Sequence, residues 1–173
     1  MTTQPVPIPY AYWVIPGHLL AGEHPGAADE TEARGTLQRL LHAGITVFID
    51  LTEAGEWDAY DHLLQEAACP VTYHRIPIVD GQPPSEGQMR EIMLIIDAAR
   101  VAQRAVYVHC AAGIGRTGAV VGCYLVHLGR NPPAALREIA RRRRTLPNGH
   151  MQSPATEVQR QFVLQWTEAK EER

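Results

Sequence analysis

The amino-acid sequence predicts a single α/β domain with a central, mostly parallel sheet flanked by helices. Short apolar runs rich in β-branched residues alternate with helix-length segments, which is typical of strand–helix–strand units. The 173 residues suit one domain with a sizeable core, and no internal repeat divides them. Residues 1–9 contain three prolines and are expected to form a loose arm ahead of a domain spanning residues 10–173.

The first half of the chain predicts three regions of sheet and two helices. Short strands are expected at residues 12–15 and 19–23, on either side of a Pro-Gly turn. A helix over residues 28–43 should end at Gly44, and the apolar run 45–51 is typical of a buried strand. The sequence then predicts a helix over residues 56–68, a strand over residues 71–76 and a loop over residues 77–85.

The second half begins with the clearest amphipathic helix, over residues 86–103. Its apolar side chains recur at helical spacing: Met89, Ile92, Met93, Ile96 and Ala99. A short strand at residues 105–109 runs into a glycine-rich loop, and an apolar helix follows at residues 119–128. Two further helices are expected at residues 132–144 and 156–169, the last with one apolar face formed by Val158, Phe162 and Trp166.

Composition excludes several classes of function. The net charge of −3 gives no general attraction to nucleic acid or to anionic membranes, so we expect no nucleic-acid partner and only a local anion site. The three cysteines, Cys69, Cys110 and Cys123, fit a reducing compartment better than a disulfide scaffold. The start lacks a secretory signal, and the apolar stretch 92–101 is too short and too charged to span a bilayer. We therefore expect a cytoplasmic monomer without a membrane span.

The glycine-rich loop between a strand and a helix predicts an anion site. Such a loop directs backbone N–H groups and the positive end of the helix dipole to one point, and Gly113, Gly115 and Gly118 permit the backbone angles it needs. Cys110 opens the loop, where these groups favour its thiolate form near neutral pH. Arg116, six positions later, can bind two phosphate oxygens with its planar guanidinium.

This loop resembles the signature H-C-x5-R-[S/T] of the protein tyrosine and dual-specificity phosphatases. The match is complete at every defining position, as the stretch reads His109-Cys110-Ala111-Ala112-Gly113-Ile114-Gly115-Arg116-Thr117-Gly118. A weaker likeness to compact members of this family extends from about Trp13 to Trp166. The resemblance implies a dual-specificity phosphatase-like fold.

The resemblance also implies a two-step phosphatase mechanism without a metal or another cofactor. Cys110 would attack phosphorus and form a phosphocysteine, and Arg116 would stabilise the transition state. Thr117 is expected to hydrogen-bond the sulfur as it leaves, and His109 to support the loop. The phosphoryl oxygens would also bind the backbone amides of Ala111, Ala112, Gly113, Ile114 and Gly115.

Members of this family carry a general acid on a mobile loop upstream, and Asp80 fits that position. It lies thirty residues before Cys110 (110 − 80), within the turn-rich segment 78–84. Four other carboxylates follow a buried strand and compete for the role: Asp50, Glu53, Glu56 and Asp58.

Other polar residues near the motif admit more than one interpretation. Either Glu53 or Glu56 could pair with Arg116. Gln159 stands where small members of the family carry a glutamine that positions the attacking water. Trp57 and Tyr60 are interpreted as helix-packing residues rather than as flanks for an aromatic substrate.

The remaining cysteines and a run of arginines have simpler interpretations. Cys123 is expected in the core, and Cys69 is expected to be a structural thiol rather than a redox partner of Cys110. The run Arg141–Arg144 is expected to be the solvated end of a helix, although it could also attract a phosphorylated partner.

Alternative functions follow from the same glycines. Gly113-x-Gly115-x-x-Gly118 also fits a dinucleotide fingerprint, but that site needs a second strand ending in an acid about 20 residues later. Glu138 has this spacing but lies in an arginine-rich helix, so the oxidoreductase hypothesis fails. A non-catalytic phosphate-binding module stays an alternative, although such modules typically lose the cysteine, the arginine or the acid.

The substrate class is less sharply defined than the chemistry. Residues 111–115 contain no lysine, which favours phosphotyrosine or mixed phosphoprotein substrates over highly phosphorylated inositides. The expected partners are therefore phosphorylated proteins or small phosphoesters, with a phosphoinositide or another non-protein phosphoester as the alternative.

Overall fold

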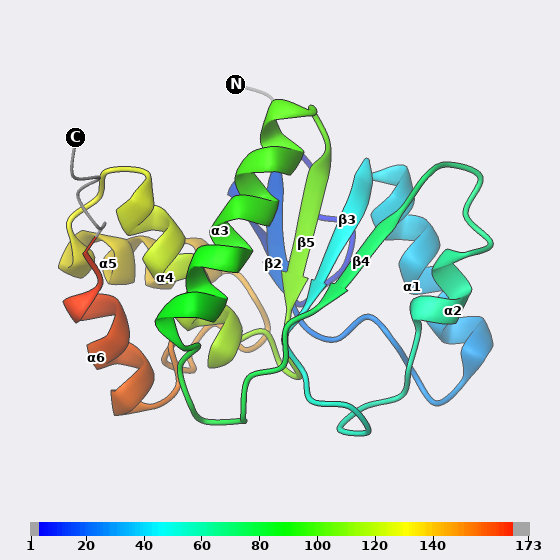
Figure 1. The fold of residues 1–173 in the computed structure, drawn as a ribbon. Coiled ribbons are helices and arrows are strands. Elements are labelled where there is room, and N and C mark those ends of the chain that lie inside the picture. Colours follow the sequence, from blue (N-terminus) through cyan, green and yellow to red (C-terminus); the bar gives the residue numbers. More distant parts are fainter. Residues whose placement is uncertain (1–3, 168–173) are drawn as a thin grey trace.

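The computed structural model describes residues 4–167, which form a five-stranded sheet with helices on both faces (Figure 1). The strands are β1 (Ala11–Ile15), β2 (Leu19–Gly22), β3 (Ile45–Asp50), β4 (Thr72–Arg75) and β5 (Ala105–His109). Their order in the sheet is β1-β2-β5-β3-β4. The β1–β2 pair is antiparallel, and the other three pairs are parallel. This confirms the predicted α/β class with a mostly parallel sheet.

Between residues 4 and 167, six helices cover the two faces of this sheet. They are α1 (Glu30–His42), α2 (Asp61–Leu64), α3 (Glu86–Val101), α4 (Arg116–His127), α5 (Pro132–Arg143) and α6 (Glu157–Gln165). Helices α3 to α6 pack on one face, and α1 and α2 pack on the other (Figure 1). Alternate residues of β5 enter the two cores, with Val106 and Val108 on the α3 side and Ala105 and Tyr107 on the α1 side.

The carboxyl ends of the parallel strands lie level with one another. Gly22 of β2 pairs with His109 of β5, His109 pairs with Asp50 of β3, and Asp50 pairs with Arg75 of β4. The loops that follow these four residues therefore lie side by side, at the lower edge of the sheet in Figure 1. In α/β sheets this edge is where ligands bind.

Helix α2 is much shorter than the helix predicted over residues 56–68. The structure is helical only from Asp61 to Leu64, and residues 51–60 form a loop. Gly55, with a left-handed φ of 79°, lies just before the predicted start, and Glu56 and Trp57 instead contact Arg116 and His24. Conversely, α4 begins at Arg116, three residues before the predicted start, because the end of the glycine-rich loop already follows helical geometry.

The buried face of α6 matches the predicted one in part, since Trp166 is buried and Phe162 packs against the core. Val158 is 51% exposed, whereas Val163 is fully buried. Val163 packs against Gly122 of α4, where an added Cβ would approach both of its methyl groups to 2.8 Å. The predicted helix also extended to residue 169, and its last two residues lie outside the described residues.

The run Arg141–Arg144 is not simply a solvated helix end, as the sequence suggested. Arg143 is 1% exposed and donates to the backbone carbonyls of Met151, at 2.8 Å, and Asn148, at 3.2 Å. The buried guanidinium therefore holds the loop that follows α5. Its neighbours Arg141 and Arg142 both donate to the carboxylate of Glu138.

Part of the expected N-terminal arm packs against the domain. Ile8 is 3% exposed and belongs to the core on the α1 side. The indole of Trp13 donates to the carbonyl of Pro5 at 3.2 Å. The stretch from Pro5 to Ile8 is thus held in place, in contrast to the loose arm predicted over residues 1–9.

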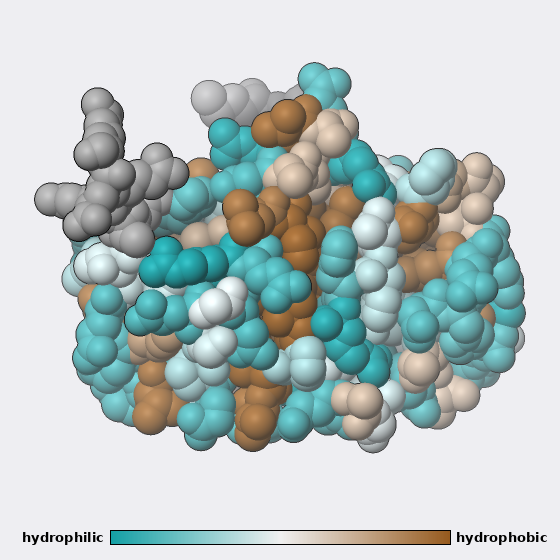
Figure 2. Space-filling view, in the orientation of Figure 1, coloured by the Kyte–Doolittle hydropathy of each residue, from teal (hydrophilic) through white to brown (hydrophobic). Residues whose placement is uncertain are grey.

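The surface beside the open edge of the sheet carries a hydrophobic band. Figure 2 shows it in the centre of this face, between α3 and β4. The groove beneath it is lined by residues that include Val47, Thr72, Leu94, Ile95 and Ala98. It runs beside the strands rather than across their carboxyl ends.

None of the helices between residues 4 and 167 is long and apolar enough to cross a bilayer.

The contact between Gly122 and Val163 makes a testable prediction about how α6 docks on α4. Gly122→Ala should lower the free energy of unfolding, because overpacking costs about 1–3 kcal/mol and exceeds the helix-propensity gain of about 1 kcal/mol. In a Val163→Ala background the same substitution should raise stability, since the methyl groups that it meets are gone. Urea unfolding of the two single variants and the double variant measures both effects.

Gly35 provides the matched control within α1. An added Cβ there would meet only the end of Arg39, at 3.8 Å, so Gly35→Ala should stabilise the protein by about 1 kcal/mol. If Gly122→Ala stabilises the wild-type chain as Gly35→Ala does, the close α4–α6 packing is wrong.

Candidate active site

The predicted anion loop lies at the start of α4, directly after β5. Gly115 is the N-cap residue of α4, and no side chain caps this helix. By contrast, α1, α3, α5 and α6 each have a side-chain cap, from Asp29, Ser85, Asn131 and Thr156. The first N–H groups of α4 are therefore available to a ligand, and the helix dipole favours an anion there.

The loop is packed closely against the end of β2. Gly113 has a φ of 70°, and an added Cβ would lie 2.4 Å from the carbonyl carbon of Gly22. Only glycine fits both this angle and this approach. The backbone N–H of His24 also donates to the carbonyl of Ala111 at 2.9 Å, so the segment after β2 supports the outer side of the loop.

Arg116 is buried and held by the two loops that follow β3 and β4. Its side chain is 1% exposed, and Nη1 donates to Glu56 at 2.8 Å and to the carbonyl of Ile78 at 3.0 Å. Nη2 also donates to Glu56, so the pair is bidentate. Of the two glutamates that could pair with Arg116, Glu56 is therefore the partner. The backbone N–H of Glu53 instead donates to Glu56 at 2.9 Å.

Glu56 keeps the buried guanidinium charged. Burial alone would lower the pKa of Arg116, but its hydrogen bonds with Glu56 and the nearby charge of Cys110 raise that pKa overall. Reciprocally, the hydrogen bonds from Arg116 lower the pKa of Glu56. The ion pair therefore persists across the neutral pH range and fixes the plane of the guanidinium.

Two buried donors beside the loop lack a hydrogen-bond partner. They are Nε of Arg116 and the hydroxyl of Thr117. Buried polar groups are nearly always satisfied, so these atoms indicate where a ligand or reacting group completes the site. Cys110, which is 3% exposed, opens the same loop. The structure thus gathers Cys110, Arg116 and Thr117 around one anion-binding loop.

Asp80 lies at the tip of the loop between β4 and α3. Its side chain is 82% exposed, and one carboxylate oxygen is 3.3 Å from Nη2 of Arg116. The structure therefore brings this aspartate to the guanidinium across a separation of 36 residues (116 − 80). An exposed carboxylate beside the anion site is free to meet the leaving group of a bound phosphoester.

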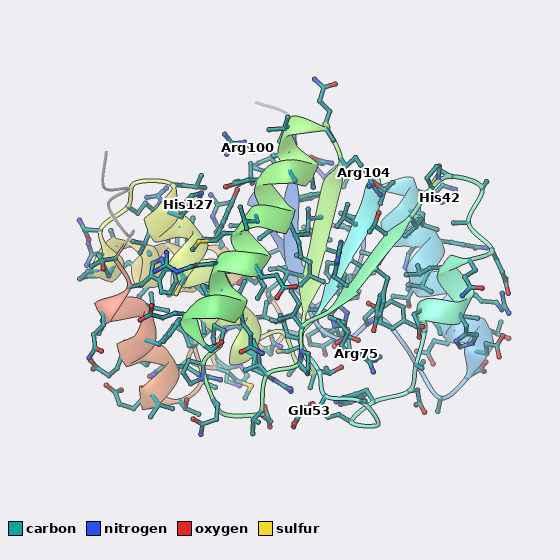
Figure 3. All side chains as sticks on the ribbon, in the orientation of Figure 1. His42, Glu53, Arg75, Arg100, Arg104 and His127 are labelled. Atoms are coloured by element: carbon teal, nitrogen blue, oxygen red, sulfur yellow. The ribbon has the colours of Figure 1, made fainter. Side chains whose placement is uncertain are left out.

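The four competing carboxylates have different surroundings. Asp50 is fully buried and accepts hydrogen bonds from Thr52, Tyr73 and Arg75, while Glu56 is occupied by Arg116. Glu53 and Asp58 are exposed in the loop after β3. Figure 3 shows Glu53 below the sheet and Arg75 near the end of β4.

Within residues 4–167, no three or more His, Cys, Asp or Glu are grouped to hold a metal ion.

The two ring nitrogens of His109 connect the start of the anion loop to Tyr60. Nδ1 lies 3.2 Å from the carbonyl of Cys110, which can only accept, so Nδ1 carries the proton. Nε2 therefore accepts from the hydroxyl of Tyr60 at 2.6 Å. Burial lowers the pKa of His109 to about 4, which keeps the ring neutral at pH 7.

Sequence reasoning missed this part of the site. Tyr60 packs in the core on the α1 side, which agrees with the packing interpretation, but its hydroxyl also forms a hydrogen bond with His109. Asp50, whose Oδ1 is 4.0 Å from Nδ1 of His109, was considered only as a competing acid. A carboxylate that ends a buried apolar strand was the available signal, because such a group needs partners.

Trp57 also lies differently from the sequence interpretation. It is 49% exposed in the loop after β3, so it does not pack in a helix. Its indole stacks on the imidazole of His24, with ring centroids 5.6 Å apart. Because Glu56 precedes it and binds Arg116, the indole stands near the rim of the anion loop.

Gln159 is fully buried at the start of α6. Its Nε2 donates to the carbonyl of Gln82 at 3.1 Å, and its Oε1 accepts from the N–H of Thr156 at 3.1 Å. The side chain therefore touches the loop that carries Asp80. Positioning of a water by Gln159 stays a prediction.

Cys69 lies before the amino end of the edge strand β4, and Cys110 follows the carboxyl end of the central strand β5. Cys69 is exposed, whereas Cys110 is buried. A disulfide needs Cα atoms within about 7 Å, which the length of the strands between them does not allow. The structural interpretation of Cys69 therefore fits better than that of a resolving thiol.

Comparison with known families agrees with this geometry. The family model described as the Swiss Army Knife protein DSP-PTPase phosphatase domain matches residues 9–170. Among solved structures, Tk-PTP in its active form has a TM-score of 0.72 and 24% identity, covering 90% of this chain and 94% of that one. Kinase-associated phosphatase has a TM-score of 0.70 and 24% identity, covering 84% and 83%. These two structures support the fold.

Curated relatives are similar over only part of their length. The Arabidopsis thaliana protein described as phosphatidylinositol 3,4,5-trisphosphate 3-phosphatase and protein-tyrosine-phosphatase PTEN1 is 30% identical over 130 residues, 69% of this chain and 30% of that protein. The dual specificity protein phosphatase CDC14AB of Danio rerio is 30% identical over 131 residues, 66% of this chain and 18% of that protein. The chain thus spans about a third or less of these relatives.

The neutral, buried His109 makes a prediction about stability and pH. Its pKa is about 4 in the folded chain and about 6.5 when unfolded, so the unfolded state binds more protons between these values. The stability that the neutral ring contributes is complete above pH 6.5 and is lost as the pH falls toward 4. Near pH 5 this loss should approach 1.4 kcal/mol per pH unit.

His109→Gln isolates this contribution, because glutamine does not titrate. Urea unfolding between pH 7.5 and pH 4.5 should show the wild type losing more stability than the variant. His24, whose pKa burial also lowers, is present in both proteins. Parallel stability curves would contradict the buried neutral state of His109.

Proposed function

The chain belongs to the protein tyrosine phosphatase superfamily as a compact, dual-specificity-like member, and on this basis we propose that it is a cysteine-dependent phosphomonoesterase. Cys110 is the nucleophile, Arg116 binds the phosphoryl group, and Asp80 is the general acid and base. Since the curated relatives are much longer than this chain, their named activities are not transferred as a whole.

One observation carries this proposal: two anion-binding groups and a cysteine thiol meet at the start of α4. The helix has no side-chain cap, Cys110 opens the loop before it, and the buried fork of Arg116 is held in place by Glu56. Asp80 is 3.3 Å from the same fork. A binding module would need the anion site alone. The nucleophilic thiol and the exposed carboxylate beside it favour catalysis over simple phosphate recognition.

The first step transfers the phosphoryl group to sulfur. The thiolate of Cys110 attacks phosphorus, a P–S bond forms, and the bond between phosphorus and the leaving oxygen breaks. Asp80 donates its proton to that oxygen. Arg116 and the amides of residues 111–115 stabilise the equatorial oxygens as charge redistributes in the transition state.

The second step releases phosphate and restores the enzyme. A water molecule attacks phosphorus, and Asp80 accepts its proton. The P–S bond breaks, and the sulfur leaves as a thiolate. The unpartnered hydroxyl of Thr117 supplies a hydrogen bond to that thiolate, which stabilises it as a leaving group.

We propose phosphotyrosine or mixed phosphoprotein substrates. Residues 111–115 carry no lysine that could bind additional phosphates. The half-exposed indole of Trp57, stacked on His24, offers an aromatic surface near the rim of the loop. A phosphoinositide substrate is the alternative, as the name of the Arabidopsis relative suggests for that protein.

The proposed function is tested by a substrate panel with the wild type and Cys110→Ser. The panel holds phosphotyrosine, phosphoserine and phosphothreonine peptides, phosphoinositides and 5′-triphosphate RNA, with phosphate release as the measurement. The wild type should favour phosphotyrosine, and Cys110→Ser should lose turnover on every substrate, because the serine has no adjacent base to activate it.

Binding distinguishes loss of the nucleophile from loss of the fold. Cys110→Ser should still bind a phosphotyrosine peptide in calorimetry, since Arg116 and the loop amides remain. Substantial turnover by this variant would overturn the nucleophile assignment. Preference for phosphoinositides would replace the substrate class but leave the chemistry intact.

Asp80→Asn tests the general acid by its dependence on the leaving group. General acid catalysis contributes about 10²–10⁴-fold and matters most when the leaving group is poor. Asp80→Asn should therefore slow phenyl phosphate strongly and the activated 4-nitrophenyl phosphate much less, measured as kcat/KM for each.

Asp58→Asn is the matched control for Asp80→Asn. Asp58 is an exposed aspartate in the neighbouring loop after β3, so it has the same chemistry near the same rim. Its substitution should change both substrates alike and only slightly. If Asp58→Asn shows the leaving-group dependence and Asp80→Asn does not, the acid is misassigned.

A further inference from the structure

We infer that the first turn of α6 holds the Asp80 loop in its catalytic position, with Thr156 and Gln159 as positioning residues. The inference rests on the proposed role of Asp80 and assigns these two residues a function in general acid catalysis. Neither side chain touches the reacting phosphate in this scheme. Both act through the backbone that carries the carboxylate.

Two hydrogen bonds connect the start of α6 to the residues directly after Asp80. The hydroxyl of Thr156 donates to the carbonyl of Gly81 at 2.8 Å. The amide of Gln159 donates to the next carbonyl, that of Gln82, at 3.1 Å. Consecutive carbonyls are thus held by two side chains of one helical turn, which fixes the path of the chain as it leaves Asp80.

The two side chains also hold each other. The hydroxyl of Thr156 accepts from the N–H of Gln159 at 3.3 Å, and Oε1 of Gln159 accepts from the N–H of Thr156 at 3.1 Å. This reciprocal arrangement is a capping box. Because a hydroxyl has one proton and two lone pairs, Thr156 can cap the helix and donate to Gly81 at the same time.

The other side of the loop is held by Arg116 and α3. Arg116 donates to the carbonyl of Ile78 at 3.0 Å, and Gln88 donates to the carbonyl of Pro77 at 2.7 Å. Within the loop, the N–H of Gln82 donates to the carbonyl of Val79 at 3.0 Å. Asp80 therefore sits between an anchor on the phosphate-binding arginine and an anchor on α6.

The segment before α6 is itself fixed to the anion loop. The hydroxyl of Ser153 donates to the carbonyl of Ile114 at 2.7 Å, and both groups are buried. Next to it, an added Cβ on Gly115 would lie 3.0 Å from the amide atoms of Gln159. Residues 153–159 thus touch the loop that binds phosphate and the loop that carries the acid. These contacts set the position of the Asp80 loop relative to the anion loop.

Thr156→Val tests the inference, because valine keeps the shape and removes the hydroxyl. Of the two hydrogen bonds that the hydroxyl makes, the one to Gly81 holds the loop, and its loss corresponds to about a fivefold to tenfold change in the population of the held loop. The kcat/KM for phenyl phosphate should therefore fall by about that factor, while that for 4-nitrophenyl phosphate should change less than about twofold. Thr156→Ser restores the hydroxyl and should restore the rate with phenyl phosphate.

The N-cap residue of α5, Asn131, provides a control that distinguishes an effect on the position of the Asp80 loop from a general loss of stability. Asn131 caps α5 through a hydrogen bond to Ala134 at 2.9 Å, and α5 does not touch the acid loop through any described hydrogen bond. Asn131→Ala loses a helix cap as Thr156→Val does. It should lower both rates equally, in proportion to any loss of folded protein. An equal loss of both rates in Thr156→Val would overturn the inference and leave Thr156 as a cap only.

The double variant Asp80→Asn/Thr156→Val distinguishes the two assignments. If Thr156 acts through Asp80, its substitution should have no further leaving-group dependence once the acid is gone. A leaving-group effect of Thr156→Val that persists in the Asp80→Asn background would overturn the inference. If Asp80→Asn alone shows no leaving-group dependence, the general-acid assignment fails instead, and the inference falls with it.

Discussion

The ion pair between Arg116 and Glu56 is the constraint on which the site depends. A guanidinium that is 1% exposed is costly to bury without a partner, and its carboxylate comes from a loop 60 residues earlier in the chain. The same guanidinium binds the carbonyl of Ile78 and lies beside Asp80. One side chain therefore draws the loops after β3 and β4 toward the loop after β5, and the positions of Asp80 and Cys110 relative to each other follow from it.

The sequence sufficed for the parts of this arrangement that are local. A cysteine, an arginine six residues later and glycines between a strand and a helix specify an anion loop without knowledge of the rest of the fold. The structure has that loop at the predicted place, after a strand with the predicted bounds. Apolar runs likewise identified the buried strands, because burial on both faces leaves little freedom in their composition.

Long-range pairs could not be predicted in the same way. Glu53 and Glu56 were equivalent in sequence, and only the left-handed turn at Gly55 and the path of the following loop decide which carboxylate meets Arg116. The predicted helix over residues 56–68 was wrong because long-range contacts of this segment outweighed its local helix propensity. The hydrogen bond of Tyr60 could not be predicted either, because its partner His109 is 49 residues away in the sequence.

The position of β5 has a consequence for how the chain is made. This strand lies in the middle of the sheet, yet it is the last strand within residues 4–167, and Leu19 pairs with Val106 across 87 residues (106 − 19). During synthesis the β1–β2 pair and the β3–β4 pair emerge first, with no strand to join them. The sheet closes only when residues 105–109 leave the ribosome, and contacts so distant in sequence form slowly. Until then, β2 and β3 each have an unpaired edge, so the nascent chain is most exposed to wrong strand pairing just before residues 110–115 are made.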